Sequence, residues 1–179
     1  MTEYKKYPST LYLPFCGAKE SDTYWGDFDH IKAMIATIKM DGENTTMYKD
    51  NIHFRSLDSN RNENDVLKAS RSYVKSLHAR IKRYIPEGWR ICGENLYAKH
   101  TLHYTDLDSY FQVFGVVNER DIALDWDNVV FFCNKLGLTP VTARTQAHPD
   151  FNRYKDWNWL DFCENTYQNT IGYLECTEG

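Results

Sequence analysis

The pattern of apolar and polar positions predicts short strands separated by turns, together with helices. The apolar run 34–38 and the β-prone run 45–48 flank Asp41-Gly42, a dipeptide typical of a tight hairpin turn. A third strand is predicted over 52–56, after a second turn at 49–51. Further strands are predicted over residues 90–97, 110–117, 138–141 and 173–177. Together with the helices, these strands predict an α+β fold.

The first predicted helix opens near Asn64 or Asp65 and stops before Pro86. Its apolar residues recur at spacings of three and four, and basic residues occupy the other side at helical spacing: Lys68, Arg71, Lys75, His78 and Lys82. This basic stripe is either a solvated face or a surface that helps to hold a nucleic-acid backbone.

A second helix is predicted from Asp125 to a C-cap at Gly137, and a helical tail from Trp157. Residues 1–30 are rich in aromatic and turn residues and are expected to pack across the domain without regular structure.

Composition narrows the class of protein. The 179 residues are 42% hydrophobic, which predicts a single domain over 1–179 with a real core. A net charge of −4 excludes a globally basic nucleic-acid coat but leaves room for a local basic groove. Five scattered cysteines without a C-x-x-C pair, no membrane-length apolar run and no signal peptide indicate a reduced, cytoplasmic protein.

The stretch from Lys39 to Asn44 reads K-x-D-G-x-N and places a lysine beside a predicted tight turn. It resembles motif I of the covalent nucleotidyltransferases, the superfamily of polynucleotide ligases and mRNA capping enzymes. In that superfamily the lysine amine attacks the α-phosphate of a nucleotide and holds the nucleoside monophosphate as a phosphoramidate. The amine must be neutral to attack, and a nearby cation favours loss of its proton.

Other motifs of the superfamily follow in the expected order. Residues 93–97 (Gly-Glu-Asn-Leu-Tyr) resemble motif III, whose glutamate binds ribose, and 110–115 (Tyr-Phe-Gln-Val-Phe-Gly) resemble motif IIIa, whose phenylalanine stacks on the base. Phe114 is the favoured stacking residue, with Phe111 as the alternative because the two residues lie on opposite faces of a strand. Glu178-Gly179 resembles the start of motif IV, whose glutamate supports the metal ion.

The resemblance to the ATP-dependent RNA ligases implies a nucleotidyltransferase fold, with twisted antiparallel sheets, flanking helices and an ATP cleft between them. It implies Lys39, Glu94 and Glu178 as catalytic residues, with Glu178 also at the metal, which is Mg²⁺ or Mn²⁺. It implies nucleotide contacts from the residues around the lysine and from two later positions: Ile38, Met40, Asp41, Gly42, Asn44, Arg55 and Phe114. Asn44 matches a position typical of RNA ligases, so the implied substrates are ATP and RNA ends bearing a 5′-phosphate and a 3′-hydroxyl.

Two positions depart from the family pattern. Ile38 stands where many RNA ligases have a glutamate before the lysine. The sequence also stops inside motif IV, so the paired lysines of motif V are missing and self-adenylylation is expected to be weak or absent. Two alternatives therefore stay open: a non-catalytic nucleotide- or RNA-binding module derived from a ligase, and a related enzyme that acts on DNA ends or on caps.

Overall fold

The computed structural model describes residues 3–8, 33–55 and 65–147. The predicted helical tail from Trp157, the predicted strand over 173–177 and Glu178 lie outside the described residues. The chain divides into two compact units. Unit 1 contains Met1–Tyr7, Met40–Thr101 and Leu107–Val141; unit 2 contains Pro8–Lys39, Leu102–Asp106 and Thr142–Gly179.

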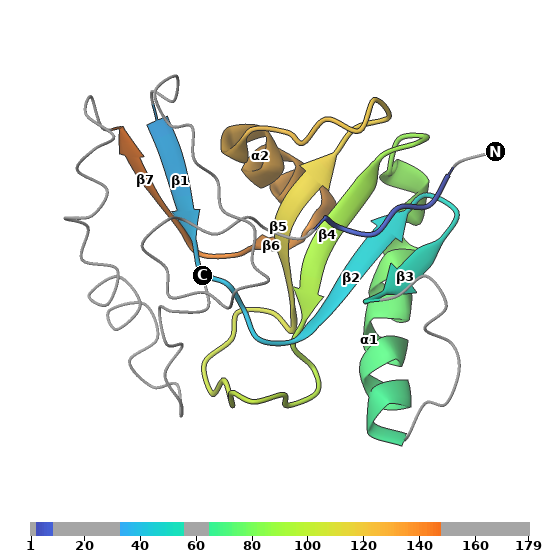
Figure 1. Cartoon of the computed structure of the whole chain (residues 1–179). Helices are drawn as coiled ribbons and strands as arrows, with labels where there is room; N and C mark the ends of the chain where they lie inside the picture. Colours follow the sequence, from blue (N-terminus) through green and yellow to red (C-terminus); the bar gives the residue numbers. More distant parts are fainter. Residues whose placement is uncertain (1–2, 9–32, 56–64, 148–179) are drawn as a thin grey trace, which may run out of the picture. The chain divides into compact units, whose positions relative to one another are not determined.

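Unit 1 is built on a five-stranded sheet in the order β3-β2-β4-β5-β6 (Figure 1). Three of its pairings are antiparallel, whereas β5 and β6 run parallel. The sheet is therefore mixed, which confirms an α+β fold and corrects the expectation of purely antiparallel strands. The strands are β2 (Glu43–Tyr48), β3 (Ile52–Phe54), β4 (Arg90–Asn95), β5 (Phe111–Val117) and β6 (Thr139–Pro140).

Two helices of unit 1 begin and end as the sequence predicts. Helix α1 spans Asp65–Ile81 and is followed by a 3₁₀ turn, η1 (Lys82–Tyr84), before Pro86. Helix α2 spans Trp126–Leu136. The Asp125 side chain caps its first turn by accepting from the Asn128 N–H, and Gly137 closes it in the left-handed conformation at φ 65°. Within the described residues, no helix is both long and apolar enough to cross a membrane.

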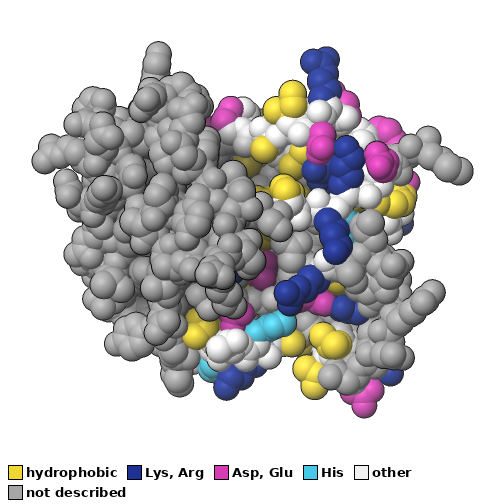
Figure 2. Space-filling view, viewed as in Figure 1, with side chains coloured by type: hydrophobic (Ala, Val, Ile, Leu, Met, Phe, Trp, Pro, Cys, Tyr) yellow, Lys and Arg dark blue, Asp and Glu magenta, His cyan; other side chains and the backbone are white. Residues whose placement is uncertain are grey.

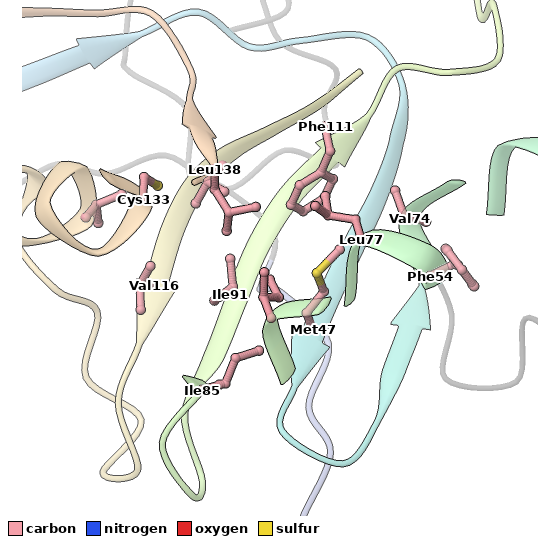
Figure 3. Close-up of a cluster of buried hydrophobic side chains, with 13 residues drawn as sticks. Met47, Phe54, Val74, Leu77, Ile85, Ile91, Phe111, Val116, Cys133 and Leu138 are labelled. Atoms are coloured by element: carbon pink, nitrogen blue, oxygen red, sulfur yellow. The ribbon is translucent and has the colours of Figure 1, made fainter. Parts of the chain in front are cut away.

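The core of unit 1 lies between the two helices and one face of the sheet (Figure 3). Met47, Ile91 and Phe111 project from three neighbouring strands toward Val74 and Leu77 of α1. Because successive side chains of a strand alternate between faces, the residues next to these point to the opposite face of the sheet. That opposite face, the candidate face, carries the candidate residues Asn44, Glu94 and Phe114.

The start of the chain lies on the face opposite the helices. The Lys5 N–H donates to the Tyr48 hydroxyl at 2.8 Å, and Nε2 of His53 lies 3.1 Å from the Lys5 carbonyl oxygen. The Tyr4 ring packs edge-on against Tyr48, with centroids 5.1 Å apart. Residues 3–8 form no regular element, so the described part of the predicted lead-in is confirmed.

Unit 2 contains a two-stranded antiparallel sheet of β1 (Ala33–Thr37) and β7 (Ala143–Ala147). The sequence predicted instead that the strand at 34–38 forms a hairpin with 45–48 through Asp41-Gly42. That pairing is wrong, because β1 pairs with β7 and β2 pairs with β3 and β4. The second predicted turn, at 49–51, does join paired strands β2 and β3, and the Tyr48 N–H donates to the Asn51 carbonyl at 2.7 Å.

Candidate functional site

The backbone on both sides of Lys39 is anchored. Ile38 and Met40 are each 4% exposed, whereas Lys39 between them is exposed. The Ile38 N–H donates to the Thr142 carbonyl at 3.0 Å inside unit 2. The backbone at Lys39 therefore lies between two buried residues, and the Lys39 side chain is exposed.

Gly42 lies directly against the strand that carries Glu94. Its N–H donates to Oε1 of Glu94 at 3.0 Å. A Cβ at position 42 would lie 2.5 Å from the Asn95 carbonyl oxygen and 2.9 Å from Cδ2 of Leu96, so only glycine fits. Gly42 and the strand that carries Glu94 are therefore in direct contact, and the hydrogen bond from the Gly42 N–H holds the Glu94 carboxylate in place.

Three polar residues lie side by side across the sheet. Asn44 on β2 pairs in register with Glu94 on β4, and Glu94 pairs with Gln112 on β5. All three alternate with residues that face the helices, so they share the opposite face. Asn44 and Glu94 are half-buried and Gln112 is 4% exposed. The sequence predicted the first two as site residues and missed Gln112, which lies within an apolar run.

Only one of the two candidate phenylalanines is accessible. Phe111 is fully buried in the core, so it cannot stack on a ligand. Phe114 is half-buried and packs edge-on against Tyr7, with centroids 4.9 Å apart and planes at 75°. It lies at a bulge, where the register of β4 and β5 shifts between Cys92 and Gly93.

The remaining predicted positions are more dispersed. Asp41 is half-buried in the stretch that joins Met40 to Gly42. Arg55 is exposed at a bend immediately after β3 and not inside a strand, which ends at Phe54. Glu178, the proposed metal ligand, lies outside the described residues. Among the residues that are described, no group of three or more His, Cys, Asp or Glu could hold a metal ion, and His100 and His103 are exposed.

The predicted basic stripe of α1 is interrupted by two buried residues. The Arg71 guanidinium donates through Nε to both oxygens of Glu43 at 3.1 Å and packs over the Phe54 ring, with its Cζ 4.5 Å from the centroid. His78 is also buried. The interpretation as one continuous basic face is therefore wrong, because helical spacing does not separate a buried cation that has a partner from a solvated one. Figure 2 shows acidic side chains among the Lys and Arg side chains of the described surface in that view.

Arg90, Asp121 and Lys5 form a group of charged side chains on the same sheet face as Glu94, farther along the strands. The buried Arg90 donates to Asp121, which also accepts from Lys5 at 3.1 Å. These bonds, led by that from Arg90, hold the pKa of Asp121 below its usual value. Through Asp121, these bonds tie Lys5 at the start of the chain to Arg90 on β4, and Nε of Arg90 is left without a hydrogen-bond partner among the described residues.

The described cysteines are unsuited to nucleophilic chemistry. Burial raises the pKa of Cys92 to about 11 and that of Cys133 to about 12. Both are free thiols in the interior, so they stay protonated near neutral pH. These two described thiols are therefore poor candidates for a nucleophile.

A protein-family model for RNA ligase matches residues 32–169. The chain belongs to the RNA ligase family. The match covers most of the sequence and includes both the Lys39 stretch and the strands that carry Glu94 and Phe114. A comparison with curated proteins found no match. Membership supports an RNA ligase-type function with RNA as substrate.

Proposed function

We propose that the chain is the adenylation domain of an ATP-dependent RNA ligase. The observation that carries the proposal is the contact between Gly42 and Glu94. It brings the backbone of the lysine motif against the carboxylate expected to bind ribose. Lys39 is three residues before Gly42, so their Cα atoms are at most about 11 Å apart whatever the path of the chain. A lysine side chain can cover much of that span.

In the first step, Nζ of Lys39 attacks the α-phosphorus of ATP. A nitrogen–phosphorus bond forms, the bond to the β-phosphate oxygen breaks, and pyrophosphate leaves. The amine must give up its proton before attack. Glu94 accepts hydrogen bonds from ribose, Phe114 stacks on adenine, and Asn44 and Arg55 position ribose or phosphate.

In the second step, an oxygen of the RNA 5′-phosphate attacks the lysine-bound AMP. The nitrogen–phosphorus bond breaks, the lysine recovers a proton, and the RNA end carries AMP through a pyrophosphate bond. In the third step, the RNA 3′-hydroxyl attacks that activated 5′-phosphate, a phosphodiester bond forms and AMP leaves.

A divalent ion is the cofactor that this chemistry implies. Mg²⁺ or Mn²⁺, when bound, neutralises charge on the phosphate oxygens. Mg²⁺ at nucleotide phosphates is usually bound by one or two protein carboxylates together with the phosphates. We assign Glu178 as the supporting carboxylate.

The test is transfer of label from α-labelled ATP with Mg²⁺. We expect weak label on the wild-type chain, no label on Lys39→Ala, and the wild-type level of label on Lys99→Ala, a matched control at an exposed lysine. Binding of ATP should be measured in parallel, on this chain and on any longer product of the same gene. Binding without label transfer would favour a non-catalytic nucleotide-binding module, and label that survives Lys39→Ala would show that another residue is the nucleophile.

Competition assays separate the related activities. GTP should not reduce labelling by ATP, and RNA ends should discharge the bound AMP faster than DNA ends. Preferential labelling by GTP would support a capping-type enzyme, and discharge only by nicked DNA would support a DNA ligase.

A further inference from the structure

Two buried side-chain atoms on the candidate face, Arg90 Nε and Gln112 Oε1, have no hydrogen-bond partner among the described residues. The Arg90 guanidinium still bonds to Asp121 through another nitrogen. Gln112 is 4% exposed, and its side-chain oxygen Oε1 has no hydrogen-bond partner among the described residues. A buried amide oxygen without a partner costs free energy, since it has lost its bonds to water. Such groups are rare in folded proteins and call for a physical explanation.

The position of Gln112 points to a ligand. In register it lies between Glu94 on β4 and Thr139 on β6, and Phe114 follows two residues later on the same strand. Its neighbours Phe111 and Val113 face the core, so Gln112 faces the side that carries Glu94. Gln112 is therefore the in-register neighbour of the carboxylate proposed for ribose, and it lies on the same strand and face as the ring proposed for adenine.

The chemistry of an amide selects among the parts of a nucleotide. Phosphate oxygens only accept hydrogen bonds, and Oε1 also accepts, so a phosphate cannot be the partner of Oε1. A ribose hydroxyl both donates and accepts, so it can satisfy the amide of Gln112 through either its oxygen or its amino group. Positions two apart along a strand are about 7 Å apart, which is the scale of one nucleoside. A base stacked on Phe114 would thus place its ribose toward Gln112 and Glu94.

We propose that Gln112 and Glu94 together clamp the ribose hydroxyls of ATP, so that Gln112 is a positioning residue that selects ribonucleotides over deoxyribonucleotides. The proposal rests on the proposed function, because it assumes that ATP binds on this face. It also explains why a costly buried amide stands in an otherwise apolar run.

Equilibrium binding of ATP, 2′-deoxyATP and 3′-deoxyATP tests the clamp. The variants are Gln112→Met, which keeps the side-chain length, and Gln112→Leu as a second apolar form. We expect each to weaken ATP binding by about three- to tenfold, the effect of one hydrogen bond. Binding of the deoxy analogue that lacks the clamped hydroxyl should change little, so discrimination should fall by the same factor.

Thr46→Val is the matched control. Thr46 is fully buried, lies on the same sheet face, and its hydroxyl donates to Sγ of Cys92 at 3.9 Å. This variant should leave the preference for ATP unchanged. The melting temperatures of the Gln112 variants should equal or exceed that of the wild type, since they remove an unsatisfied polar atom.

The outcomes are distinguishable. If the wild type binds ATP but the Gln112 variants keep its discrimination, the clamp is wrong and the proposed function stands. If the wild type binds none of the three nucleotides, the proposed function and the clamp fail together. A large drop in melting temperature for both variants would show that the amide has a structural role and would overturn the inference.

Discussion

At the scale of single residues, Gly42 is required for a different physical reason from the one that its sequence pattern indicates. Asp41-Gly42 predicted a hairpin turn, which usually needs glycine for a positive φ. Among the described glycines only Gly88 and Gly137 have positive φ. Gly42 is required instead because the backbone of Asn95 lies where its Cβ would be. This contact joins residues about fifty positions apart, so no local pattern could reveal it.

We therefore expect Gly42→Ala to destabilise the fold by about 1–3 kcal/mol and to displace Glu94, because the new methyl must push the strand away. Gly115→Ala is the control, since its nearest neighbour, Cε2 of Tyr7, would be 4.0 Å from the new Cβ. Chemical denaturation of both variants measures the difference. A Gly42→Ala protein as stable as the control would show that the close approach is absent in solution.

Single residues of the candidate site could be predicted only where they belong to a motif of the family resemblance. Lys39, Glu94 and Phe114 came from the family resemblance, and accessibility then separated Phe114 from the buried Phe111. Gln112 escaped because a single polar residue inside a β-like run carries no signal of its own. Its importance depends on its neighbours across two strands, which only the register supplies.

At the scale of elements, the sequence predicted helices better than strand partners. Helix α2 carries its own boundary signals in Asp125 and Gly137, and both are confirmed. Strand β7 was missed because residues 143–147 lack β-branched alternation, and its partner β1 is more than one hundred residues away. Pairing over such a distance depends on tertiary packing, so the local Asp-Gly signal gave the wrong partner for β1.

Helix α1 makes the stability of unit 1 depend on pH. Burial lowers the pKa of His78 below its ordinary value of 6.5, and Lys82 adds to the lowering, while the bond to the Tyr48 carbonyl and the charge of Asp50 oppose it. The unfolded chain therefore binds more protons than the folded chain just below pH 6.5. Stability from this residue is fully present above that pH and falls as the pH drops through the window.

We expect His78→Gln to flatten this loss of stability below pH 6.5, because glutamine can still donate to the Tyr48 carbonyl and does not titrate. Denaturant midpoints measured from pH 7.5 to pH 5 would show the change. His100→Gln replaces an exposed histidine and should keep the wild-type slope. Parallel pH profiles for the wild type and His78→Gln would contradict the assignment.

At the scale of the whole molecule, the residues proposed to contact the nucleoside belong to one unit. Glu94, Gln112 and Phe114 all lie in unit 1, whereas Lys39 is the last residue of a unit 2 segment and Met40 begins the next segment of unit 1. Nucleoside binding and covalent chemistry should therefore separate by mutation. The two units are distinguished only by the contacts within each of them. The expectation of one domain over 1–179 therefore stays a prediction.

ATP should stabilise the folded chain by mass action, because only the folded state binds it. At one hundred times its dissociation constant the gain is about 2.7 kcal/mol, or roughly 5–10 °C in Tm for a chain of this size. Lys39→Ala should keep this shift, since it removes the nucleophile and leaves Glu94, Gln112 and Phe114 in place. Phe114→Ala should lose most of it, because the base loses its stacking surface.

Thermal unfolding with and without ATP and Mg²⁺ measures both shifts, with Phe131→Ala, at an exposed ring of α2, as the control. An equal loss of the shift in Lys39→Ala and Phe114→Ala would show that binding depends on the lysine itself, and no shift in the wild type would remove ATP as the ligand.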